Sequence, residues 1–297
     1  MTDRDQTLIT IATHQLSADI NPLGAELFGL RDRDGRGLLW HGGPSFWKGR
    51  APILFPIVGA LAGNQYRLGD GRFSLPRHGF ARNRKFSLLD FKPASALFRL
   101  RWDEETFKVY PFHFELDLRF SLIDATLDIV ASVKNLEREK TLPASFGFHP
   151  ALCWPLPYGE LRSAHFLEFE KDEPGSIRRV NTDGLILPDR PPTPVVKREL
   201  RLNDGLFTAD AIIFDDLASR RLRYGAERGP RLEIAFSTMP QLAIWTKPGA
   251  GFICVEPWHG FADPEGYSGD IREKPGIALL PPGTAKEFGM SITLLAE

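Results

Sequence analysis

Apolar and polar residues alternate strictly along residues 114–122, and this alternation restricts the fold more than any other feature of the chain. In the segment FELDLRFSL every second side chain is Phe or Leu. The positions between them carry Glu115, Asp117, Arg119 and Ser121. Because successive side chains of a strand point to opposite faces of a sheet, one face of this segment is expected to be buried and the other exposed. Such a pattern is typical of a strand in an antiparallel sheet.

Short runs of similar character recur along the chain, separated by turn-forming residues. The sequence contains 27 glycines and 24 prolines, which favour frequent turns. Residues 125–133 follow the first strand after a short turn, so we expect the two to pair as neighbours. No segment keeps the 3.6-residue period of an amphipathic helix, and many short strands predict an all-β sandwich or barrel. The other expected strands are 96–102, 164–170, 231–237, 241–246, 252–256 and 287–295.

Length and charge indicate the broad class of protein. We expect one domain over residues 1–297, because no repeat or clear linker occurs and the proline-rich stretch 187–200 is typical of a surface loop. The net charge of -1 argues against a nucleic-acid partner. No apolar run is long enough to span a membrane, and the polar N-terminus lacks the apolar core of a signal peptide. These features predict a cytoplasmic protein with no membrane partner.

Glu256 lies in the otherwise apolar segment FICVEPWHG. Ionised carboxylates are rarely buried without a partner. Two further segments, 76–82 and 146–150, each present a histidine, His78 and His149, among apolar residues, glycine and proline. One carboxylate and two histidines are sufficient to move protons on a small polar substrate. Each residue taken alone also fits a structural role, the carboxylate in an ion pair and the histidines in the core.

Other chemistries fit the same residues less well. The histidines show no HExxH or comparable metal-ligand spacing, so we expect no metal site. Cys153 and Cys254 lie in apolar surroundings without a redox or metal spacing, and no local motif supports Cys153 as a nucleophile. A glycosidase needs two catalytic carboxylates, and Asp210 with Glu256 is a candidate pair. That hypothesis leaves the two histidine segments unexplained.

Six stretches, taken in order along the chain, resemble the aldose 1-epimerase (mutarotase) family. The similarity is greatest to the branch that includes LacX-type proteins and hexose-6-phosphate epimerases. The resemblance implies a β-supersandwich of large antiparallel sheets, in agreement with the two-residue period. The matching stretches are RAPILFPIVG (50–59), LPRHGFAR (75–82), YPFHFELDLRFSL (110–122), FGFHPAL (146–152), ADAIIF (209–214) and WTKPGAGFICVEPWHG (245–260).

The resemblance also implies roles for individual residues. Glu256 matches the catalytic base of the family, and His149 matches its catalytic acid. His78 matches a histidine that hydrogen-bonds the substrate near the ring oxygen. Asp210 matches an aspartate that binds sugar hydroxyls, and Arg50 matches an arginine that lines the same cleft.

The chemistry of anomer exchange explains these residue types. Ring opening of a cyclic aldose removes the proton of the C1 hydroxyl and protonates the ring oxygen. A carboxylate with a reference pKa of about 4.3 is a suitable base, and an imidazole with a reference pKa of about 6.5 is a suitable acid. Closure on the other face of the aldehyde inverts C1 without any cofactor.

We therefore expect an enzyme, a monomer or homodimer, that interconverts the α and β anomers of a hexose or hexose phosphate. The alternative is a non-catalytic carbohydrate-binding or sugar-sensing protein on the same scaffold, with the same small-molecule sugar as its partner. Such a protein would be expected to lose Glu256 or His149, and this chain retains both.

A basic cluster surrounds His78 in the sequence. Arg77 stands where relatives often carry glutamine, and Arg82, Arg84 and Lys85 follow it. The cluster fits either a solvated surface or a clamp for a sugar phosphate, since arginine suits bidentate phosphate contacts. We assign Arg82 to substrate binding. Trp245 is a candidate wall for the C–H face of the sugar, with core packing as the alternative.

Overall fold

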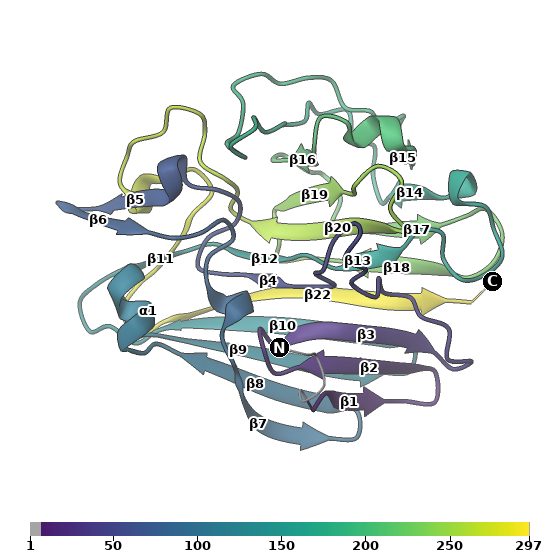
Figure 1. The fold of residues 1–297 in the computed structure, drawn as a ribbon, viewed down its shortest axis with the longest axis horizontal. Helices are drawn as coiled ribbons and strands as arrows, with labels where there is room; N and C mark the ends of the chain where they lie inside the picture. The colour runs from purple at the N-terminus through teal and green to yellow at the C-terminus, as the bar shows by residue number, and fades with distance from the viewer. Residues whose placement is uncertain (1–6, 297) are drawn as a thin grey trace.

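A computed structural model describes residues 7–296, and antiparallel strands dominate it (Figure 1). The expected all-β fold is confirmed. The largest sheet has nine strands, all paired antiparallel to their neighbours. Its strand order is β15 (Glu199–Arg201), β14 (Phe166–Phe169), β17 (Arg221–Gly225), β18 (Arg231–Ala235), β22 (Ala285–Leu295), β10 (Thr126–Asn135), β9 (Phe114–Ile123), β8 (Ser95–Arg101) and β7 (Ser87–Lys92).

The segment with strict alternation forms β9. From Phe114 to Leu122, its Phe and Leu side chains are at most 4% exposed. The polar side chains that alternate with them are partly exposed or exposed. β10 pairs with β9 along its whole length, from Thr126 opposite Ile123 to Asn135 opposite Phe114. The expected pairing of these two neighbours is therefore confirmed.

A second sheet of six strands lies across the core from β22 and β10. Its strands are β16 (Ile212–Phe214), β19 (Gln241–Trp245), β20 (Phe252–His259), β12 (Phe146–Phe148) and β4 (Ile53–Leu54), with β13 (Ala151–Cys153) also paired to β20. The two sheets meet through aromatic side chains, because Phe146 of β12 stacks on Phe288 of β22 with ring centroids 5.3 Å apart. Both belong to one continuous cluster of buried residues. β20 is buried along seven of its eight residues, which explains its almost unbroken apolar sequence.

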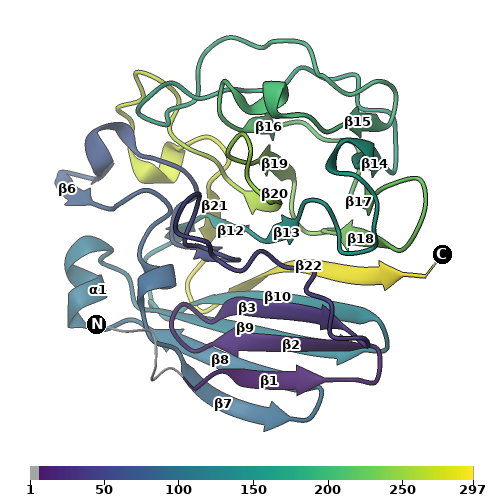
Figure 2. The same cartoon turned by 45° about the vertical axis from the view of Figure 1, so that its right-hand side comes forward.

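The remaining strands form three smaller sheets. The first, which the sequence analysis did not predict, packs against β8, β9 and β10 (Figures 1 and 2). Its strands carry polar side chains on buried positions, including Asp19 and Asn21, and so do not alternate cleanly. The strands of the three sheets are β1 (Ile9–Ala12), β2 (Leu16–Asn21) and β3 (Glu26–Asp32), then β5 (Gln65–Leu68) with β6 (Gly71–Ser74), and β11 (Leu142–Ala144) with β21 (Ala278–Leu280).

Helices are short. In α1 (Glu104–Val109), the Asp103 carboxylate accepts a hydrogen bond from the Thr106 N–H, and the Thr106 hydroxyl accepts one from the Asp103 N–H. This reciprocal capping satisfies backbone donors that a helix start leaves unpaired. Among the described residues, no helix is both long and apolar enough to cross a membrane. The 3-10 helices are η1 (Ala62–Asn64), η2 (Ala81–Asn83), η3 (Arg162–Ala164), η4 (Asp204–Phe207) and η5 (Ile271–Glu273).

Adjacent residues of β9 provide a test of this packing. Leu118 is fully buried, whereas Arg119 is exposed. We expect Leu118→Ala to lower the free energy of unfolding by about 2–5 kcal/mol, because it removes buried methyl groups and leaves a cavity. Arg119→Ala should change it by less than about 0.5 kcal/mol. Urea denaturation of both variants measures the difference, and equal effects would contradict the assigned faces of β9.

Candidate active site

A cleft of about 320 Å³ collects side chains from segments far apart in the sequence. It brings together six of the seven residues that the sequence analysis selected as catalytic or substrate-binding. These are His78, Arg82, His149, Asp210, Trp245 and Glu256. The exception is Arg50.

Strand pairing places His149 opposite Glu256. On either side of His149, β12 and β13 pair with β20 in one register, Gly147 with Trp258 and Ala151 with Cys254. The same register sets His149, midway between the two paired positions, across from Glu256. Prolines follow both residues, and because proline has no backbone N–H, the hydrogen-bond ladder is interrupted at this point.

The two side chains meet in a buried position. Nε2 of His149 lies 3.2 Å from Oε2 of Glu256, and the two side chains are 10% and 2% exposed. The contact is not aligned as a hydrogen bond, and within residues 7–296 neither Oε2 of Glu256 nor Nδ1 of His149 has a hydrogen-bond partner. Both atoms are buried, and the described part of the fold supplies neither with a hydrogen-bond partner.

Burial changes the protonation of this pair. Desolvation, with a further contribution from the charge of Asp210, raises the pKa of Glu256 well above its usual value. Desolvation lowers the pKa of His149 to about 3. Because the low-dielectric site disfavours charge on both groups, burial favours a protonated carboxyl and a neutral imidazole. Such close groups titrate as a unit that holds one proton, so the reference pKa values used in the sequence analysis do not describe this pair.

His78 has a defined tautomer. It occupies the loop before η2 with a φ of 68°, and the Gly59 N–H donates to its Nδ1 at 3.1 Å. Desolvation, followed by the charges of His149, Arg82 and Arg77, holds the pKa of His78 well below its usual value. The imidazole is therefore neutral and carries its proton on Nε2. It can donate a hydrogen bond to a sugar oxygen.

Two tryptophans form the apolar side of the cleft. The Trp47 ring lies 4.8 Å from the His149 ring, centroid to centroid, and the Trp245 ring lies 5.8 Å from it. Trp47 belongs to the loop between β3 and β4, and the sequence analysis missed it. Its only sequence signal is an aromatic residue within the glycine-rich stretch HGGPSFWKG. The two rings meet edge to face at 82°, with centroids 5.6 Å apart, and form an apolar corner of the kind that suits the C–H face of a sugar.

Charged residues line the rim. Arg77 and Arg82 both face the cleft, and so does Lys247, which the sequence analysis did not select. Nη2 of Arg82 donates to the Arg77 carbonyl at 2.9 Å. The Arg77 guanidinium passes so close to Gly184 that a Cβ there would lie 1.8 Å from Nη2. Only glycine at this position permits that side-chain path.

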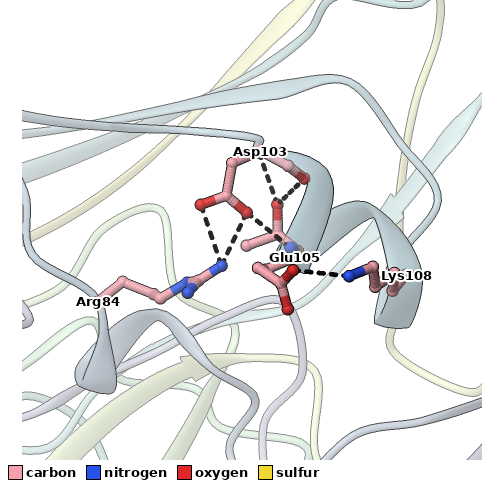
Figure 3. A network of polar contacts seen from close by, with 5 residues as sticks. Arg84, Asp103, Glu105 and Lys108 are labelled. Carbon is pink, nitrogen blue, oxygen red and sulfur yellow. Dashed lines mark hydrogen bonds and ion pairs between the residues drawn. The ribbon is translucent and has the colours of Figure 1, made fainter.

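The remaining basic residues lie elsewhere. Arg84 forms a two-pronged ion pair with Asp103 at the start of α1 (Figure 3). Lys85 is not among the residues that line the cleft, and its backbone bridges to Leu23. The basic cluster of the sequence is therefore divided, with only its first half at the site.

Arg50 is also directed away from the cleft. Its guanidinium lies 3.6 Å from the centre of the Phe28 ring, and Nη1 donates to the Phe28 carbonyl at 2.7 Å. The structure thus does not support the expectation that Arg50 binds substrate, because stacking and a hydrogen bond hold it against β3.

One group of side chains has the composition of a metal site. His149, Cys254 and Glu256 each offer a ligand atom, and these atoms lie within 4.8 Å of one another. Metal binding requires deprotonated thiol and carboxyl groups. Burial raises the pKa of both Cys254 and Glu256 well above their usual values, which opposes that requirement. Burial also raises the pKa of Cys153 to about 11, so this thiol is protonated at neutral pH.

Comparison with known proteins shows the family of the chain. The LacX protein of Lactococcus lactis subsp. lactis is 34% identical over 296 residues, covering 97% of this chain and 99% of that protein. A galactose mutarotase related enzyme from Lactobacillus acidophilus superposes with a TM-score of 0.90 at 29% identity, covering 98% of each chain. A galactose mutarotase-like protein from Lactobacillus casei gives 0.87 at 28% identity, covering 97% of this chain and 100% of that one. The aldose 1-epimerase family profile matches residues 7–269. The chain belongs to the aldose 1-epimerase family.

Proposed function

We propose that the protein is an aldose 1-epimerase, which interconverts the α and β anomers of a hexose or hexose phosphate. The observation that carries this proposal is the buried pair of His149 and Glu256, whose facing atoms are 3.2 Å apart beside the cleft. A second proton-transfer partner is unnecessary, because one base and one acid complete the ring opening. The family membership supports the same reaction class.

The pair acts by relocating one proton. In the charged form, the Glu256 carboxylate takes the C1 hydroxyl proton while protonated His149 delivers its proton to the ring oxygen. The pair is then neutral, and reclosure reverses both transfers. Reference pKa values of 4.5 and 6.5 favour the charged form by about 2.7 kcal/mol, and burial acts against this preference. Burial therefore favours the neutral pair, and the charged form that starts the reaction is reached when the Glu256 proton moves to His149 across the 3.2 Å contact.

The other residues of the cleft bind and orient the sugar. Nε2 of neutral His78 donates to an oxygen near the reacting carbon, and the Asp210 carboxylate accepts from adjacent hydroxyls. Trp47 and Trp245 cover the C–H face and exclude water from the pair. The charges at the rim of the cleft suit either a free or a phosphorylated hexose. Arg77, Arg82 and Lys247 are positive there, and the Asp210 carboxylate is negative.

Saturation-transfer NMR between anomers tests the activity. We expect wild-type protein to exchange the anomers of glucose, galactose or glucose 6-phosphate faster than the spontaneous rate. Glu256→Gln should lower kcat on the order of 10²-fold or more, because it removes the proton acceptor. Sugar binding without exchange in the wild type would favour the carbohydrate-binding alternative. Normal turnover in folded Glu256→Gln would reject this residue as the base.

His149→Asn separates acid catalysis from binding. We expect a fall in kcat on the order of 10²-fold with a small change in KM, since the proton is donated only in the transition state. Steady-state kinetics on the best substrate of the panel measures both constants. A variant with a raised KM and unchanged kcat would make His149 a binding residue instead.

The shared proton predicts how stability depends on pH. Between about pH 4.5 and 6.5 the unfolded chain holds one proton on His149 and the folded pair holds one on Glu256, so the pair contributes no slope. Above 6.5 the unfolded chain loses its proton while the raised pKa of Glu256 keeps the folded pair protonated, so stability falls as pH rises until the pH passes that pKa. Below 4.5 the unfolded chain binds a second proton and the folded pair does not until about pH 3, so stability falls as pH drops.

The measurement compares wild type with the Glu256→Gln/His149→Asn double variant by urea denaturation across this pH range. The difference in unfolding free energy should show a plateau that declines on both sides. A difference that increases steadily with pH would mean that the folded pair does not retain the proton.

A further inference from the structure

A second cleft, of about 430 Å³, lies next to the catalytic cleft, since Ala262 lines one and Asp263 the other. It is bounded by the β5–β6 hairpin and by the segment that follows β20, which lie side by side in Figures 1 and 2. The clefts have no lining residue in common. Among the residues that line the second cleft, Arg67, Arg72 and Lys274 are basic and Asp263 is acidic, which leaves an excess of two positive charges.

The two arginines occupy an unfavourable position for folding. Arg67 of β5 pairs directly with Arg72 of β6, so their side chains project from the same face of the hairpin. Like charges directly opposite each other destabilise a strand pair. Nη1 of Arg67 has a long contact of 3.4 Å to the Ser268 carbonyl, and within residues 7–296 the exposed side chain of Arg72 has no hydrogen-bond or ion-pair partner. The fold therefore does not explain this pair.

The third cation lies buried in the same cleft. The side chain of Lys274 is 1% exposed, and its Nζ donates to Oδ1 of Asp263 at 2.7 Å. Oδ2 of Asp263 accepts from the Ala62 N–H at 2.9 Å, which fixes the carboxylate. An ammonium group has three N–H donors, and the described chain supplies Lys274 with this one hydrogen-bond acceptor. The lysine and Asp263 thus form an enclosed ion pair at the base of the cleft.

Neighbouring carboxylates do not neutralise the arginines. Both oxygens of Asp270 accept from Arg272, at 2.8 and 2.7 Å, and the Gly69 N–H donates to one of them. Glu265 accepts from the Asn181 side chain instead. Neither acidic residue lines the cleft.

We propose that this second cleft binds the phosphate group of a small ligand, either inorganic phosphate or a phosphate monoester. The two guanidinium groups contact the phosphate oxygens from the hairpin, and the buried ion pair of Lys274 and Asp263 lies beneath them. Arginine forks match phosphate geometry bidentately, and a dianion offsets the repulsion between Arg67 and Arg72. The site is separate from anomer exchange and does not depend on that activity.

Phosphorus NMR titration at low ionic strength tests the site with two probes, inorganic phosphate and glycerol phosphate. We expect one saturable site per chain in the wild type. Arg67→Gln/Arg72→Gln should weaken it at least about 10-fold, because both phosphate-facing charges are lost. Tighter binding of either probe supports the proposal and identifies the free or the esterified form as the preferred ligand.

Two single variants serve as matched controls. Arg119→Gln removes one exposed charge from the middle of β9, and Arg77→Gln removes one from the catalytic cleft. Arg119→Gln should bind phosphate as the wild type does, and Arg77→Gln shows whether any phosphate binding occurs in the catalytic cleft. Absence of saturable binding in the wild type would overturn the proposal. The proposal would also be overturned if Arg119→Gln weakened phosphate binding as much as the double variant does. A third contrary result would be weaker phosphate binding in Arg77→Gln together with unchanged binding in the double variant.

Thermal unfolding shows whether a variant that binds phosphate more weakly is still as stable as the wild type. Because the two arginines repel each other, the double variant should melt at the same temperature as the wild type or higher. If it melts lower, Arg72→Gln alone replaces it, since Arg72 has no partner in the described chain whose loss could disturb the fold. Unweakened binding in folded Arg72→Gln would then overturn the proposal.

Discussion

Burial of the Glu256 carboxyl beside His149 is the constraint on which the site depends. A charged carboxylate at 2% exposure would be strongly disfavoured, so the site must hold a proton. The same desolvation that raises the pKa of Glu256 lowers that of His149. The two shifts oppose the preference that these side chains have in water. Without the surrounding sheets, this balance between proton positions would not exist.

The sandwich supplies that burial. β20 lies between β19 and the pair of β12 and β13, and the aromatic contact between Phe146 and Phe288 joins this sheet to the nine-stranded one. The apolar faces of β9 and β10 extend the same core. Packing that stabilises the fold therefore also keeps water from one side of the catalytic pair. The loops that carry Trp47 and His78 cover the other side.

Strand residues were predictable from their pattern, whereas His78, His149 and Asp210, which lie between the regular elements, were given their roles only by the family resemblance. Alternation identified β9, and an acidic residue in an apolar run identified Glu256. Arg50 was misplaced because stacking on Phe28 depends on a contact more than 20 residues away. Trp47 and Lys247 lie in loops, where no period marks a direction. The protonation state of His149 and Glu256 was also not predictable, because reference pKa values describe side chains in water and not buried ones.

The register of β20 has a consequence for how such a chain can diverge. A slip by one residue would turn Glu256 to the opposite face of the sheet and present Val255 or Pro257 to the cleft. Insertions and deletions inside β20 are thus incompatible with the site, whereas substitutions that keep the register are not. The loops that carry Trp47 and Lys247 are free of this restriction. Over evolutionary time, new sugar preferences are therefore expected to arise through changes in loop length around a strand whose length stays constant.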